Sequence, residues 1–305
     1  MAVLWMFAWV ALAITPAQYR ARFEEGASAL ERNDVAKAEA VFEELTKVDP
    51  KNATAWLLLA RAYAKDRKPE QAVRAAKQAE ATGGSDPKIL QHLADFYAIA
   101  VPDPAKAADL GARYAERTSG DATAWRRLAV YCLEAGLTDR AIAAGVRGLE
   151  SDNSAEMHTI LGNAYAQKND WPKAAAEMTA AVKLNPYSED AHFQLARVYL
   201  VQQDFASAVR TLQDARKFFD KSAQIELALG VGYYGQRKFS EAVDQFLKTM
   251  QLAPDVPQPY LFVSRIMDHA NDRISELMAR FAAFHERNPG SYLGYMLHAK
   301  ALVAY

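Results

Sequence analysis

Small residues recur along this chain about once every 34 residues, and this spacing constrains the fold more than any other feature. The first series of small residues is Gly26, Ala60, Ala94, Ala129, Gly162, Ala196 and Gly230. A second series with nearly the same steps is Ala38, Ala72, Ala107, Ala141, Ala174, Ala208 and Ala242. Two series that share one period predict seven copies of one structural unit.

Each unit is predicted to be a pair of helices joined by a polar turn, because apolar residues follow the helical period within each half. The small residue of the first helix lets the second helix approach closely, and the small residue of the second helix contacts the next pair. The turns include Arg32–Asp34, with the sequence RND, and Lys168–Asp170, with the sequence KND. Pro50, Pro186 and Pro254 follow the second helices and are expected to end them.

Two irregular spacings are expected to lie in turns, where a helical repeat tolerates insertions and deletions. Ala94 and Ala107 are thirteen residues apart instead of twelve, which predicts an extra residue within Val101–Pro104. A residue is missing between Ala141 and Gly162, and we place this deletion near residues 150–154. Gly111 and Gly145 stand where bulky residues are usual, so their helices are expected to be thinner and less stable.

The pattern resembles the tetratricopeptide repeat (TPR) family, in which W-x2-L-G-x2-Y is followed by A-x3-F and then by proline. The residues that match it best are Trp56, Leu59, Ala60 and Tyr63, and then Gly230, Tyr233, Ala242, Phe246 and Pro254. The resemblance implies an all-α fold, a right-handed helix-turn-helix solenoid (TPR superhelix) of about eight repeats. We predict seven repeats over residues 18–254, a degenerate eighth over 255–289 and a terminal helix over 290–305.

Both ends of the chain are apolar. The run from Ala2 to Ile14 is shorter than the ~20 residues of a membrane span. It has the length of the apolar core of a secretory signal, and small residues follow at Ala11, Ala13 and Ala17. Residues 1–17 are therefore interpreted as a signal peptide or an apolar N-terminal helix. We expect an exported protein, periplasmic or extracellular, with a cytoplasmic or membrane-anchored location as the alternative.

The terminal segment 290–305 contains only one charged residue, Lys300. It is interpreted as an apolar cap, as a surface for homo-oligomer formation, or as the end of a chain cut from a longer protein.

Charge and motif content argue against several classes of function. The net charge of −1 gives no strong field for nucleic acid or an anionic membrane. The single cysteine, Cys132, excludes an intrachain disulfide and a cysteine-based zinc cluster. No zinc-protease, nucleophile-elbow or phosphate-loop motif is present. His158 and His192 occupy the slot of Trp56 and Trp125, which favours packing over metal binding. We therefore predict no catalytic residue, metal or cofactor.

The predicted site is a surface. In the TPR family the first helices line a concave groove, and their fifth, ninth and thirteenth positions face it. In this chain those positions include Arg61, Lys65, Arg126, Asn163, Gln167, Phe193 and Arg197. The charged groups are interpreted either as a solvated face or as a site for an acidic or C-terminal segment, because arginine pairs well with carboxylates. The carboxylate clamp of chaperone-binding members is not reproduced.

The resemblance implies a non-enzymatic scaffold that binds protein or peptide partners in its groove. Two alternatives stay open from the sequence. The chain is the repeat region of a larger enzyme, such as a glycosyltransferase or peptidase, or it is a structural subunit of a cell-envelope assembly.

Overall fold

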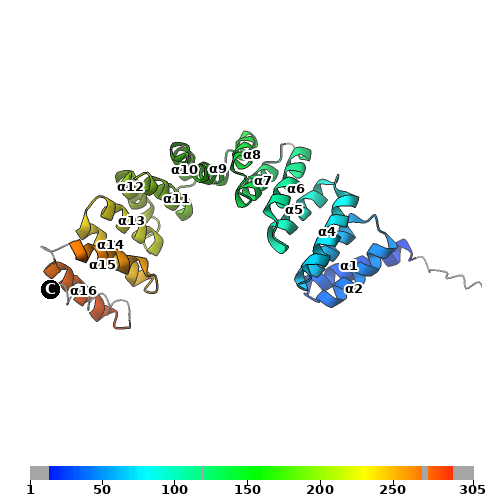
Figure 1. Ribbon diagram of the computed structural model, residues 1–305, viewed down its shortest axis with the longest axis horizontal. Helices are drawn as coiled ribbons and strands as arrows, with labels where there is room; N and C mark the ends of the chain where they lie inside the picture. The colour runs from blue at the N-terminus through cyan, green and yellow to red at the C-terminus, as the bar shows by residue number, and fades with distance from the viewer. Residues whose placement is uncertain (1–13, 119, 270–273, 291–305) are drawn as a thin grey trace, which may run out of the picture. The chain divides into compact units, whose positions relative to one another are not determined.

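The computed structural model describes residues 14–118, 120–269 and 274–290, and every regular element in these ranges is a helix (Figure 1). The all-α prediction is therefore confirmed. The chain divides into two compact units, residues 1–151 and residues 152–305. Within each unit consecutive helices form antiparallel pairs that pack on the next pair.

The first helices of the pairs are α1 (Pro16–Glu31), α3 (Ala53–Lys65), α5 (Pro87–Asp95), α7 (Ala122–Glu134), α9 (Ala155–Gln167), α11 (Glu189–Val201), α13 (Ala223–Gly235) and α15 (Gln258–His269). The second helices are α2 (Val35–Val48), α4 (Pro69–Gly83), α6 (Pro104–Arg117), α8 (Thr138–Ser151), α10 (Trp171–Leu184), α12 (Phe205–Arg216), α14 (Phe239–Leu252) and α16 (Ile274–Arg287). A short π-helical segment, η1 (Phe96–Ala100), continues α5.

The small residues of both series lie at helix–helix contacts, as their spacing predicts. A Cβ atom added to Gly162 would lie 2.7 Å from Cε of Met178, on the paired helix. At Gly230 the added atom would lie 2.4 Å from the ring of Phe246. The alanines of the second series, such as Ala174, are fully buried. The period of the sequence is thus a period of close packing.

The turn within each pair has one residue in the left-handed region of backbone conformation, in six of the seven repeats found in the sequence. These residues are Asn33, Arg67, Gly136, Asn169, Gln203 and Arg237, with φ between 59° and 70°. Each follows the small residue of the first series by seven positions. Asparagine and glycine adopt this conformation readily. The asparagines of the sequences RND and KND, Asn33 and Asn169, are therefore well suited to this position of the turn.

In the third repeat the seventh residue after Ala94 is Val101, with φ −136°, because this repeat is one residue longer. The residue directly before the N-cap of the second helix, which is left-handed at Asn33 and Arg67, is here Pro102. Proline cannot adopt a positive φ, so the ordinary turn cannot form. The chain instead forms η1, in which the backbone N–H of Val101 donates to the carbonyl of Phe96, 3.1 Å away. The extra residue is therefore accommodated within the first helix, and our placement of it in the turn Val101–Pro104 was wrong.

The missing residue does lie in a turn. Two residues separate the end of α8 at Ser151 from Ser154, the N-cap of α9, whereas three separate Leu184 from the N-cap Ser188. The boundary between the two compact units falls at this shortened turn.

Gly111 does not leave a thin helix. α6 is a regular helix of 14 residues, and a Cβ atom at Gly111 would lie 2.8 Å from the ring of Tyr131, on α7. The aromatic side chain of the next repeat therefore occupies the space that a bulky residue would fill.

The ends of the described ranges bear on the predicted segments. α1 begins at Pro16, with Thr15 as its N-cap, so it overlaps the end of the segment 1–17. α15 and α16 occupy the region predicted as a degenerate eighth repeat. The apolar run before Ile14 and the terminal helix after Gly290 lie outside the described residues. None of the described helices is both long enough and apolar enough to span a bilayer.

Candidate functional site: a basic cleft on the first unit

A cleft of about 500 Å³ opens on the first unit between α1, α3 and η1. Its lining residues are Ala27, Leu30, Glu31, Leu58, Arg61, Ala64, Lys65 and Ala100. Five of these are apolar, two are basic and one is acidic. The cleft can therefore bind a ligand that combines an apolar group with a negative charge.

The two basic residues come from one face of α3, because Arg61 and Lys65 are four residues apart. Lys65 is partly held in place: its Nζ donates to the carbonyl of Leu30 at 3.1 Å and to Oδ1 of Asn33 at 3.4 Å. Arg61 is exposed and has no carboxylate within ion-pair distance in the described part of the chain. Its guanidinium is thus available to an incoming anion.

Arg61 is close enough to His92 for its charge to act on that side chain. Burial lowers the pKa of His92, and the charges of Arg61 and Arg127 lower it further, whereas Asp95 acts in the opposite direction. Asp95 itself accepts hydrogen bonds from Arg127 at 2.7 Å and 2.8 Å. Asp95 is therefore already engaged by another arginine, and the carboxylate that lines the cleft itself is that of Glu31.

The remaining predicted groove residues do not join this cleft. Arg126 lies on α7, half-buried, and already interacts with other groups. Asn163 and Gln167 lie on α9 of the second unit. The structure thus brings together Arg61 and Lys65, and the apolar walls around them were not predicted.

Phe193 and Arg197 lie on α11, also in the second unit. Phe193 is half-buried against a cluster that includes Ala196 and Leu212. Part of its ring therefore packs on the core of its own unit and is not available to a ligand. Arg197 is exposed.

Part of the apolar wall could have been found from the sequence. Leu58 stands three residues before Arg61 and therefore shares its helix face, and Ala64 directly precedes Lys65. Ala100 could not have been found in this way, because it reaches the cleft through the π-helical turn.

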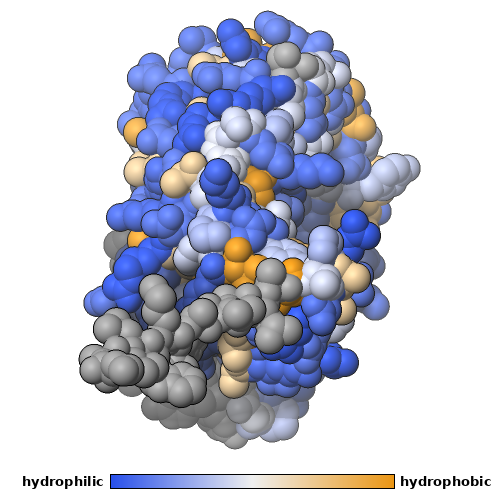
Figure 2. Space-filling model, turned by 90° about the vertical axis from the view of Figure 1, so that its right-hand side faces the viewer, coloured by the Kyte–Doolittle hydropathy of each residue, from blue (hydrophilic) through white to orange (hydrophobic). Residues whose placement is uncertain are grey.

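The surface around the N-terminal end of the molecule is mostly hydrophilic, with small separate apolar areas (Figure 2). Large exposed apolar patches mark many protein interfaces, but the coloured part of this face shows only separate apolar areas. A compact cleft therefore suits this surface better than a broad apolar contact.

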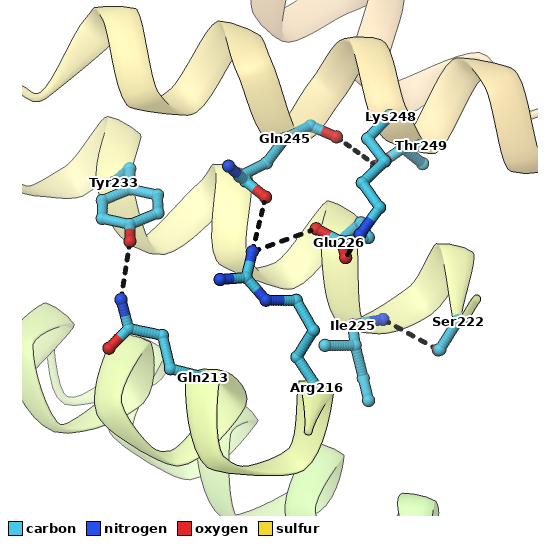
Figure 3. A network of polar contacts seen from close by, with 9 residues as sticks. All are labelled: Gln213, Arg216, Ser222, Ile225, Glu226, Tyr233, Gln245, Lys248 and Thr249. Atoms are coloured by element: carbon cyan, nitrogen blue, oxygen red, sulfur yellow. Dashed lines mark hydrogen bonds and ion pairs between the residues drawn. The ribbon is translucent and has the colours of Figure 1, made fainter. Parts of the chain in front are cut away.

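A second polar cluster, in the second unit, is structural (Figure 3). Glu226 of α13 is fully buried and binds Lys248 of α14, while Arg216 of α12 lies 3.8 Å from its second carboxylate oxygen. Arg216 also donates to Gln245 at 3.2 Å. The buried carboxylate thus joins three consecutive helices, and its two cations are needed to offset its burial.

Glu226 stands four residues before the small residue of its repeat, the position that Trp56 holds in the second repeat. His158 and His192 hold the same position, and the contacts of this position account for both histidines. Nε1 of Trp56 donates to the carbonyl of Pro50 at 2.9 Å, and Nε2 of His192 lies 3.0 Å from the carbonyl of Pro186. His158, in the same slot, binds Glu177 through Nδ1 at 2.6 Å. These contacts fit the packing interpretation of the two histidines.

Comparison with known proteins agrees with the packing. Residues 23–87 and residues 165–230 each match a profile described as tetratricopeptide repeat. The chain contains tetratricopeptide repeats. No curated protein sequence matches the chain.

Solved TPR structures share the fold. The C-terminal part of a TPR repeat-containing protein from Cytophaga hutchinsonii is 14% identical, with a TM-score of 0.60 over 79% of this chain and 98% of its own. A MamA structure is 21% identical, with a TM-score of 0.50 over 55% of this chain and 92% of its own. MamA residues 41 to the end from Desulfovibrio magneticus RS-1 are 16% identical, with a TM-score of 0.50 over 54% and 94%. At these identities the likeness concerns the fold alone.

Proposed function

We propose that the chain is a non-enzymatic scaffold whose first unit binds an acidic segment of a partner protein in the cleft between α1, α3 and η1. The observation that carries the proposal is the combination of apolar walls with an arginine, Arg61, that has no ion pair among the described residues. Repeat proteins of this architecture present extended surfaces for partner chains.

The partner segment places a carboxylate near Arg61 and Lys65. Exposed ion pairs of this kind contribute roughly 0.2 to 1 kcal/mol each and weaken with salt. The apolar lining, in which Leu58 is half-buried, then supplies the larger share of the affinity, because covering apolar surface contributes about 25 cal/mol per Å². A negatively charged segment without any apolar side chain should bind weakly.

The test reverses the charge of the cleft. Native extract is passed over the immobilised parent chain and over the double variant Arg61→Glu, Lys65→Glu, and bound proteins are identified by mass spectrometry. Partners of the cleft are expected to bind the parent and to be lost from the variant, and a moderate rise in salt should weaken them.

A matched control makes the same change in net charge elsewhere on the first unit. Lys47→Glu, Lys88→Glu alters two exposed residues that do not line the cleft. Equal retention of the same partners by the cleft variant and by the control variant would contradict the proposal. Circular dichroism of all three chains checks that the helices are intact.

A further inference from the structure

The third repeat contributes only an apolar residue to the cleft, whereas the first and second repeats also contribute charged residues. Ala100, the last residue of η1, lines the cleft. Ile99, directly before it, is 79% exposed, more than any other large apolar side chain in the described ranges. An isoleucine left this open contributes little to the core, so its position calls for another explanation.

The three repeats can be aligned by counting back from the N-cap of each second helix, at Asp34, Lys68 and Asp103. The third residue before the N-cap is the last residue of the first helix in every case, and these residues all line the cleft: Glu31, Lys65 and Ala100.

The residues one step earlier are Leu30, Ala64 and Ile99. Leu30 and Ala64 line the cleft, and Ile99 has the equivalent place in the sequence of its repeat, next to the lining residue Ala100. The three helix ends thus contribute an acidic, a basic and an apolar residue to the lining, and Ile99 stands directly before the apolar one.

The apolar pair depends on η1. In the second repeat the residues after Lys65 are Asp66 and Arg67, which form the ordinary polar turn. In the third repeat Val101 and Pro102 stand in place of Asp66 and Arg67, and the proline prevents this turn. Ile99 and Ala100 are then the last two residues of the π-helical turn. π-Helical turns of this kind are rare and occur frequently at functional sites.

We propose that η1 makes the cleft selective for an acidic side chain that stands next to a branched aliphatic side chain in the partner segment. The acidic side chain meets Arg61, whose charge no carboxylate neutralises in the described residues, and the aliphatic side chain covers Ile99 and Ala100. This inference rests on the proposed function of the cleft and adds the element that sets its selectivity. The acidic Glu31 at the opposite border disfavours a second carboxylate there.

The test uses two short peptides that are acetylated at the N-terminus, amidated at the C-terminus and labelled with fluorescein. One contains the pair glutamate–isoleucine within a serine and glycine sequence, and the other contains glutamate–serine at the same place. Fluorescence anisotropy measures both dissociation constants. The parent chain should bind the glutamate–isoleucine peptide about tenfold more tightly, the discrimination expected when one apolar group is covered.

Two variants, Ile99→Ser and a graft of the turn, remove the apolar side chains beside the cleft, and a third, Val48→Ser, is the control. Ile99→Ser should reduce the tenfold preference to less than about twofold, whereas Val48→Ser should retain it. Val48 is also an exposed aliphatic residue, but it ends α2, a helix that contributes no residue to the lining of the cleft. A turn graft replaces residues 97–103 by the sequence of residues 63–68, which restores an ordinary turn. It should remain helical, bind both peptides and lose the preference.

The outcomes separate the two proposals. Equal binding of both peptides by the parent, with loss of binding in Arg61→Glu, would overturn the role of η1 and leave the cleft as the binding site. A preference retained by the turn graft would also overturn it. Failure of the parent to bind either peptide at about 1 mM would overturn both proposals.

Discussion

At the scale of single residues, the packing of each repeat depends on what faces its small residue. Gly162 faces Met178, whose unbranched side chain has several rotatable bonds. Gly230 faces Phe246, which is fully buried and stacks on Phe262 with ring centroids 5.1 Å apart. The same position in two repeats therefore differs in how much extra volume its surroundings can accept.

This difference predicts unequal costs for one substitution. Gly162→Ala should change the free energy of unfolding by less than about 0.5 kcal/mol, because alanine gains about 1 kcal/mol of helix propensity and Met178 can move aside. Gly230→Ala should destabilise the chain by roughly 1 to 2 kcal/mol, because the ring of Phe246 cannot yield. Urea denaturation followed by circular dichroism measures both changes. Equal midpoints for the two variants would show that the neighbouring side chain does not decide the cost.

Overpacking gives a stronger test of the same contact. Replacing Gly162 or Ala174 by leucine should cost about 1 to 3 kcal/mol, because neither position has room for a branched side chain. The measurement is again the urea midpoint, and an unchanged midpoint for both variants would mean that these residues are not at the helix–helix contact.

At the scale of helices, the sequence predicts most of what the structure contains. The second helices end before Pro50, Pro186 and Pro254, as expected, because proline cannot continue a helix. The η1 segment was not predicted. A spacing of thirteen shows that a residue has been added, but it does not show whether the turn or the helix accommodates it. The helix accommodates it because Pro102, directly before the N-cap of α6, cannot adopt the positive φ that the ordinary turn requires.

Consecutive repeats are also joined by ion pairs, and Glu80 of α4 provides a test of one. Its carboxylate binds Lys106 at 2.9 Å and Arg113 at 2.5 Å, both on α6. Burial acts to raise the pKa of Glu80, but the hydrogen bonds from Lys106 and Arg113 outweigh it and leave the pKa below its ordinary value of 4.5. The bridge therefore stabilises the folded state most when Glu80 is ionised.

Glu80→Gln should destabilise the first unit by roughly 1 to 2 kcal/mol at neutral pH, since two charge-assisted hydrogen bonds are weakened. Because the folded-state pKa is lowered, the difference between parent and variant should be constant above about pH 4.5 and should shrink as the pH falls below it. Thermal unfolding at several pH values measures this. A difference that stays constant down to about pH 3 would contradict the bridge.

At the scale of the whole molecule, the sequence predicts the repeats better than the site. Repeats contact only their neighbours, so the spacing of small residues carries the information needed to pack them. The groove positions were chosen by the same spacing, but a binding surface also depends on what the side chains already contact. Phe193 is partly used by its own core and Arg126 already has partners, whereas Arg61 is open to a ligand.

Export of the chain stays a prediction, and the structure of α1 sharpens it. The side chain of Thr15 accepts a hydrogen bond from the backbone N–H of Gln18 at 3.3 Å, and the Gln18 side chain accepts one from the backbone N–H of Thr15 at 2.9 Å. This reciprocal cap holds the start of α1, and losing such a cap costs about 1 kcal/mol. Cleavage after Ala17 would remove it, whereas cleavage after Ala13 would leave it intact.

We therefore expect the mature protein to begin at Ile14, with the small residues Ala11 and Ala13 in the positions that a signal peptidase requires. N-terminal sequencing by mass spectrometry of the protein purified from the cell envelope and from the medium tests this. Ala13→Arg should block cleavage at this site, and Ala17→Arg should leave it unaffected. A mature N-terminus at Gln18 would contradict the role of the cap. A protein that retains Met1 or Ala2 and is found only in the cytoplasm would contradict export itself, and partners of the cleft would then have to be sought among cytoplasmic proteins.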